Sequence, residues 1–173
     1  MKKSFPLWEL IGFGATALCG TLLHFLYDWT GESVFAALIS GVNESTWEHM
    51  KLLFFPTFFF AIIQRQYFKE LQGFWCIKLG GIITGQILIP VIFYTYNGAF
   101  GKSPDWLNIT IFFVCAAISY ITEVRLYNQG FSCKRPRLSL IAICIIGALF
   151  IIFTFYSPHL PLFQDPITKA YGI

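Results

Sequence analysis

Long apolar stretches separated by short polar segments make up most of this chain. Three of them, residues 79–101, 106–122 and 138–158, contain no acidic, basic or histidine residue, and a fourth, residues 10–27, is interrupted only by His24. A membrane-spanning helix needs about 20 mostly apolar residues. The pattern therefore predicts four spanning helices.

A fifth apolar stretch, residues 52–64, is too short to cross a membrane by itself. Its 13 residues would cover about 20 Å of a hydrocarbon core about 30 Å thick. An extension toward the N-terminus through residues 45–51 lengthens it to a spanning helix and places Glu48 and His49 about one turn below the surface. We choose this extension and predict a fifth span.

The predicted fold is an all-α, polytopic membrane bundle that forms a single domain over residues 1–173. A short apolar segment between the first two spans is expected to lie in the interface or to dip in re-entrantly, since it cannot cross. The expected spans are residues 7–28, 45–64, 75–97, 106–124 and 138–157, with an interfacial segment at 33–42 and an outer C-terminal tail at 158–173.

Composition agrees with a membrane protein and excludes two other classes. Hydrophobic residues make up 56% of the chain and charged residues 12%, whereas a soluble domain carries about 25% charged residues. The net charge of +3 is too small and too scattered for a nucleic-acid-binding face. Membrane lipids are the expected partners, and the sequence identifies no protein partner. The five cysteines form no close-spaced pair, so we expect packing roles for them.

The distribution of basic residues predicts the orientation. Cytoplasmic loops carry the excess of Lys and Arg. With the N-terminus inside, nine basic residues lie on the inner side and three on the outer side. The prediction is therefore an N-terminus inside and a C-terminus outside.

Polar residues of the first span fall on one helix face. Gly12, Thr16, Gly20, His24 and Asp28 follow one another at four-residue spacing, which places them on one side of a helix. Small residues allow helices to approach closely in a bilayer. We expect this face to carry His24 and Asp28 into the interior near the outer end, where they either bind neighbouring helices or form part of a functional site.

Two further polar clusters lie on the same predicted side. Ser45 followed by Glu48 is a capping box, which leaves Glu44 and His49 without a structural explanation. The segment after the last span contains three prolines within residues 156–166. We expect it either to fold back over the outer mouth, bringing His159 and Asp165 to the other groups, or to form a simple outer loop.

Several runs of residues resemble a known family. They are residues 24–29 (HFLYDW), 43–51 (NESTWEHMK), 155–166 (FYSPHLPLFQDP) and 171–172 (YG). The chain resembles small bacterial integral membrane proteins of unknown function that share the Asn-Glu-Ser-x-Trp-Glu-His motif. The resemblance implies a bacterial plasma-membrane location and no particular activity. A looser similarity of residue types is to membrane hydrolases of the ceramidase and adiponectin-receptor type, which hold zinc in a helical bundle.

The gathered imidazole and carboxylate groups predict a site for zinc or another divalent ion. The candidate metal ligands are His24, Asp28, His49, His159 and Asp165, and the candidate catalytic residues are Glu44 and Glu48, either of which would act as general base. One hypothesis is a metal-dependent membrane hydrolase acting on a lipid or lipid-linked substrate. The alternative is a non-enzymatic membrane protein, such as a small transporter, an ion-binding component or an accessory component, in which the cluster is structural.

Overall fold

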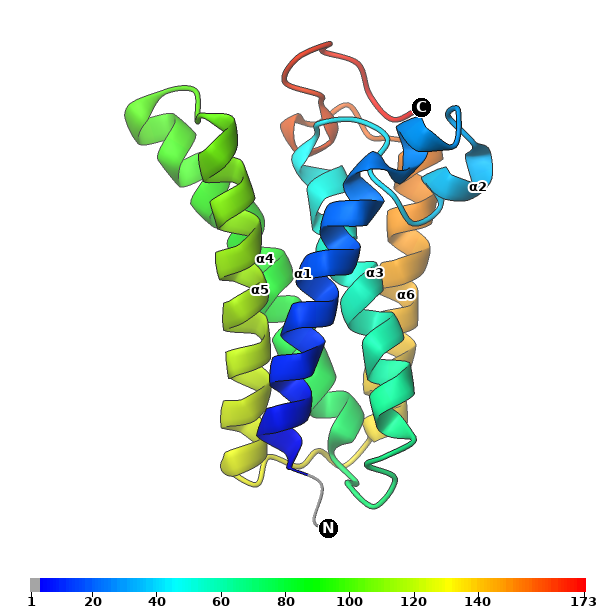
Figure 1. Cartoon of the computed structure of the whole chain (residues 1–173), viewed down its shortest axis with the longest axis vertical. Coiled ribbons are helices and arrows are strands. Elements are labelled where there is room, and N and C mark those ends of the chain that lie inside the picture. Colours follow the sequence, from blue (N-terminus) through cyan, green and yellow to red (C-terminus); the bar gives the residue numbers. More distant parts are fainter. Residues whose placement is uncertain (1–3) are drawn as a thin grey trace.

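Five long helices run alongside one another in the computed structural model, which describes residues 4–173 (Figure 1). A short helix follows the first of them, and a 3₁₀ turn lies in the C-terminal tail. The elements are α1 (Phe5–Trp29), α2 (Val34–Ala37), α3 (Thr46–Arg65), α4 (Phe74–Phe100), α5 (Asp105–Asn128), α6 (Pro136–Phe155) and η1 (Pro161–Phe163). The predicted class, an all-α helical bundle, is confirmed.

Four of the helices, α1, α4, α5 and α6, are long and apolar enough to cross a membrane. The 20 residues of α3 give it a length of about 30 Å, but its apolar character is weaker. The reason is its central position, because α3 packs against the four other long helices. Polar residues such as Thr57 and Gln64 are buried against protein rather than exposed to lipid. The crossing of the membrane by α3 remains a prediction.

The two ends of the bundle differ in what they carry (Figure 1). One end, which we call the tail end, holds the end of α1, the start of α3, helix α2 and the C-terminal tail, residues 156–173. The opposite end holds the starts of α1, α4 and α6.

Proline begins the first turn of α6 and directly precedes α5, positions where its missing amide is tolerated. Gly101, with φ of 85°, ends α4 in a conformation that favours glycine.

The small-residue face of α1 packs against α3 and α5. A Cβ atom added at Gly12 would meet the rings of Phe60 and Tyr120 at 2.6 and 2.7 Å. The Thr16 hydroxyl lies 2.7 Å from that of Tyr120. Close helix approach is therefore the role of this face, as small residues in membrane bundles allow.

The inward face of α1 ends one turn earlier than the spacing predicts. His24 is half-buried, whereas Asp28 is exposed. The buried residue of the last turn is Tyr27, which packs on Ala36 and Ala37 of α2. The expectation that Asp28 points into the interior is wrong, because α2 covers a different side of this turn.

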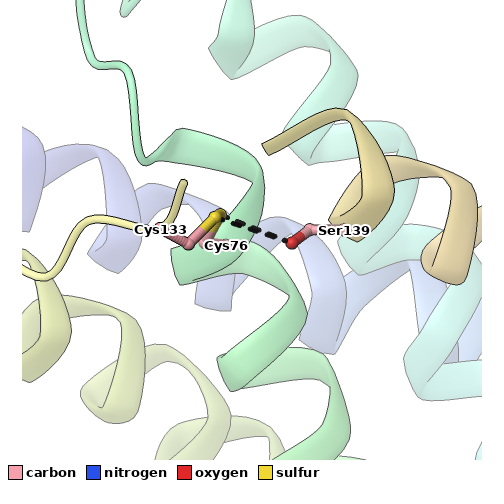
Figure 2. The surroundings of a disulfide bond; sticks show 3 residues. All are labelled: Cys76, Cys133 and Ser139. Carbon is pink, nitrogen blue, oxygen red and sulfur yellow. Dashed lines mark hydrogen bonds between the residues drawn. A yellow bond between two sulfur atoms is a disulfide. The ribbon is translucent and has the colours of Figure 1, made fainter. Parts of the chain in front are cut away.

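Two cysteines are joined rather than merely packed. Cys76 in the first turn of α4 and Cys133 in the α5–α6 loop form a disulfide, and their Cα atoms lie 6.3 Å apart. Figure 2 shows Ser139 beside it, with its hydroxyl 3.4 Å from the Cys76 sulfur. The packing role predicted for all five cysteines is therefore wrong for this pair, because the fold brings together residues 57 positions apart.

Candidate functional site

Three of the predicted site residues meet at the tail end. His24 comes from α1, Glu44 from the loop before α3 and His49 from the first turns of α3. Each of the three residues offers one potential ligand atom, and these three atoms all lie within 4.8 Å of one another. The Glu44 carboxylate lies between the imidazoles, with Nε2 of His24 3.6 Å from Oε1 and Nε2 of His49 3.5 Å from Oε2.

A backbone contact fixes which nitrogen of His49 faces the cluster. Its Nδ1 lies 3.0 Å from the Ser45 carbonyl oxygen. A carbonyl only accepts hydrogen bonds, so Nδ1 is assigned the hydrogen and donates it. In the neutral imidazole, the lone pair is then on Nε2, which faces Glu44. Histidines that bind metals are oriented by this kind of second hydrogen bond.

The C-terminal tail holds the loop that carries Glu44. The Glu44 amide donates to Oδ2 of Asp165 at 3.4 Å, and the Asn43 side chain donates to the Gly172 carbonyl at 3.1 Å. Oδ1 of Asp165 accepts the amides of Ile167 and Thr168. Burial by itself would raise the pKa of Asp165, but these three amides outweigh it and lower the pKa below its usual value. Asp165, predicted as a metal ligand, thus fastens the tail to the loop.

Glu48 belongs to a different, buried cluster. Its carboxylate forms an ion pair with Lys51 and accepts hydrogen bonds from the Thr154 hydroxyl and the Val42 amide. Ser45 caps α3 by accepting from the Glu48 amide. The returning half of the capping box is absent among the described residues, because the Ser45 amide donates to Asn43 instead. Glu48 therefore links α3 to α6.

The structure brings together His24, Glu44 and His49 and leaves the other candidates elsewhere. His159 is exposed and its ring lies 4.7 Å from that of Tyr171, measured between centroids. Asp28 is exposed on the last turn of α1. The assignment of Asp28, Glu48, His159 and Asp165 to the site stays a prediction that variants can test.

Two cavities meet at the cluster. The larger, of about 440 Å³, is lined by His24, Glu44 and His49 together with aromatic and aliphatic side chains of α1 and α5. The smaller, of about 110 Å³, is lined by Glu44 and His49 on one side and by Lys102 and Ser103 on the other. Apolar cavities with a few convergent polar groups are the usual form of ligand sites. In Figure 1 the joined ends of α4 and α5 lean away from the tail on this side.

Two polar residues of α5 line both cavities and were not among the sequence candidates. They are Asp105 and Asn108. Asn108 accepts a hydrogen bond from Ser103 at 2.7 Å, and the Ser103 amide donates to Asn97. The only signal in the sequence was an acidic residue on the predicted outer side, since no spacing relates Asp105 to the histidines.

Four helices long and apolar enough to cross a membrane indicate a membrane protein, and a cluster of two histidines and one glutamate lies at one end of its bundle. The chain belongs to the family of unknown function DUF6512, whose model matches residues 1–173. No curated protein and no solved structure matches the chain. The resemblance to a family of unknown function is thus confirmed over the whole chain, and it brings no activity with it.

Proposed function

We propose that the protein binds a divalent metal ion, zinc or one similar to it, through His24, Glu44 and His49. The distances within the cluster support this proposal. Two ligand atoms about 2.0–2.1 Å from a tetrahedral zinc ion lie about 3.4 Å from each other. Each imidazole nitrogen lies at close to that separation from the carboxylate oxygen that it faces, 3.6 Å from Oε1 for His24 and 3.5 Å from Oε2 for His49, and one ligand atom from each of the three residues lies within 4.8 Å of the other two. Both nitrogen-to-oxygen distances are longer than the roughly 2.7–2.9 Å of a direct charge-assisted hydrogen bond.

The ligand set and the cavity favour a catalytic rather than a structural ion. Structural zinc sites have four protein ligands, whereas catalytic sites have three and leave one position for water. A bound ion would lower the pKa of that water and make it a nucleophile at neutral pH. Three protein ligands beside a cavity of about 440 Å³ fit the second arrangement.

Other residues of the cavity have separate proposed roles. With Glu44 in the ligand set and Glu48 in an ion pair, Asp105 is the carboxylate that lines both cavities without belonging to either cluster. We assign the proton-accepting role to Asp105. Asn108 beside it would orient the substrate.

The walls of the cavity indicate a lipid or lipid-linked substrate. Phe25, Phe112 and Phe113 line the larger cavity together with Ile109. The side chains of Phe25, Ile109 and Phe113 are also exposed on the outside of the bundle. An acyl chain could therefore enter from the bilayer without crossing water. The proposed reaction is hydrolysis of a bond in such a molecule.

The proposed location is a bacterial plasma membrane, with five spans, the N-terminus inside and the site on the outer side. The nine-to-three distribution of basic residues supports this orientation. A reporter enzyme that is active only outside the cytoplasm, fused after residue 173, is expected to be active. A reporter active only in the cytoplasm at this position would contradict it.

Elemental analysis of protein purified without chelator tests the metal proposal. We expect about one zinc or similar ion per chain, and strong loss in His24→Ala, Glu44→Gln and His49→Ala. The matched control is His159→Ala, which removes the third histidine from an exposed position outside the cluster. Wild-type protein that neither contains metal nor binds added zinc would refute the proposal.

A lipid-hydrolysis assay separates the enzyme from the ion-binding alternative. The substrates are ester- and amide-linked lipids supplied in detergent to metal-loaded protein. Hydrolysis that requires the metal and falls in Asp105→Asn supports the enzyme. Stoichiometric metal without hydrolysis of any lipid supports a non-enzymatic ion-binding component.

A further inference from the structure

A third cluster of charged residues lies near the opposite end of the bundle and is fully buried. Glu9 of α1, Lys78 of α4 and Glu123 of α5 form it. The Lys78 ammonium is 2.9 Å from each oxygen of Glu9 and 2.5 Å from Oε2 of Glu123. The side chains of Lys78 and Glu123 are 0% exposed and that of Glu9 is 2% exposed.

The surroundings offer little further charge. The Lys78 ammonium lies 5.6–5.7 Å from the ring centres of Phe5, Phe74 and Tyr120. From α3, the Gln64 amide group donates to Glu9 at 2.9 Å, and the Arg65 guanidinium lies 5.6 Å from the centre of the Phe74 ring. The Tyr120 hydroxyl is bonded to Thr16. Lys78 is therefore the one ammonium in direct contact with the two carboxylates among the described residues.

The charges of the cluster do not balance when all three groups are ionised. Two carboxylates and one ammonium leave a net charge of −1 inside the bundle. Burying an uncompensated charge is expensive, and two carboxylates that share one site resist ionising together. One additional proton makes the cluster neutral.

The hydrogen bonds show which carboxylate gains most from that proton. Glu9 receives both the Lys78 ammonium and the Gln64 amide group, and such donors favour the charged form. Glu123 receives Lys78 on Oε2 alone, while its buried Oε1 has no partner within residues 4–173. Glu123 is thus the less compensated of the two.

We propose that Glu123 holds a proton and that Glu9, Lys78 and Glu123 form a proton-binding site within the membrane-spanning part of the bundle. Buried carboxylates of this kind serve as relay stations in proton-transferring membrane proteins. Glu9 and Lys78 are each four residues from the start of their helix, or about 6 Å along the axis. The buried rings of Phe5 and Phe74 lie beside the Lys78 ammonium.

Infrared spectroscopy of the full-length protein in detergent tests this proposal. A protonated carboxyl group has a carbonyl stretching band that a carboxylate lacks. We expect such a band at neutral pH, lost in Glu123→Gln and kept in Glu70→Gln, which alters an exposed glutamate. Absence of the band from the wild-type protein, or its persistence in Glu123→Gln, would overturn the proposal.

Thermal stability provides a second, independent test. Glu123→Gln resembles the protonated side chain, so its melting temperature is expected to stay near that of the wild type. Glu9→Gln leaves Glu123 as the one carboxylate in contact with Lys78, so Glu123 is expected to release its proton to keep the cluster neutral, and the infrared band is expected to disappear. A band that persists in Glu9→Gln, or a large decrease in the melting temperature of Glu123→Gln, would contradict a protonated Glu123. Metal content is expected to be unchanged in Glu123→Gln, so this test is independent of the tail-end site.

Discussion

Replacing Glu48 by glutamine separates a structural carboxylate from a catalytic one. Lys51 is fully buried, and its charge is compensated by Glu48, with further hydrogen bonds to the Ala37 carbonyl and the Thr154 hydroxyl. Glu48→Gln leaves the ammonium buried without a counter-charge. Removing one member of a buried ion pair costs about 3–5 kcal/mol. We expect about 3 kcal/mol, the lower end of this range, because the single amide oxygen of glutamine can still accept a hydrogen bond from Lys51.

A double-variant cycle in detergent measures this coupling. Thermal or denaturant unfolding is followed for wild type, Glu48→Gln, Lys51→Met and the double variant. The double variant is expected to recover most of the stability lost in Glu48→Gln, since replacing a whole buried ion pair by uncharged side chains is often nearly neutral. Folded Glu48→Gln protein is expected to bind metal as the wild type does.

A stable Glu48→Gln variant that has lost its function would support a catalytic role for Glu48. If Glu48→Gln melts like the wild type and has lost its metal or activity, the carboxylate acts in the chemistry and the ion pair contributes little. A double variant that is less stable than either single variant would show that Glu48 and Lys51 do not compensate each other's charge.

Three other predictions concern the tail, the packing of α1 and the disulfide. The pKa of Asp165 is lower in the folded protein than its usual value of 3.8. The ionised carboxylate therefore stabilises the tail fully above pH 3.8, and this stabilisation is lost as the pH falls through the lower pKa of the folded protein. Protease protection of the tail should therefore decrease only below about pH 4, and Asp165→Asn should decrease it at neutral pH. Gly20→Ala places a Cβ atom 2.6 Å from an aromatic ring of α5 and should lower the free energy of unfolding by about 1–3 kcal/mol. Gly14→Ala adds a Cβ atom that meets nothing within 4 Å and should not destabilise the protein. Equal effects of the two variants would contradict the packing of α1 against α5. Denatured protein kept without reductant should expose three alkylatable thiols, because Cys76 and Cys133 are joined; five would show a reduced pair.

The sequence was sufficient to predict the helical bundle because membrane spans are encoded in consecutive apolar residues. It was less informative for α3, because this helix packs against the four other long helices and buries polar residues such as Thr57 and Gln64 among its apolar ones. Helical spacing correctly placed His24 on the packed face of α1, but it wrongly placed Asp28 there. The last turn of α1 packs against α2 through Tyr27, and spacing along the sequence does not show which side of this turn α2 contacts.

The site itself could be predicted only in part. Glu44 and His49 are close in sequence, and His24 follows from the α1 face, so their side of the bundle was foreseeable. Polar residues at one end can nevertheless pair in many ways. The ion pair of Glu48 with Lys51 and the attachment of Asp165 to backbone amides depend on side-chain directions that spacing does not fix.

X-ray absorption at the zinc edge, measured on protein loaded with one equivalent of zinc, identifies the atoms that bind the ion. We expect two imidazole nitrogens and at least one carboxylate oxygen at about 2.0–2.2 Å. One imidazole is expected to be lost from the spectrum of His49→Ala, and the spectrum of His159→Ala should be unchanged. Zinc bound only by oxygen or sulfur atoms, or a spectrum that changes in His159→Ala and not in His49→Ala, would contradict a metal site built from His24, Glu44 and His49.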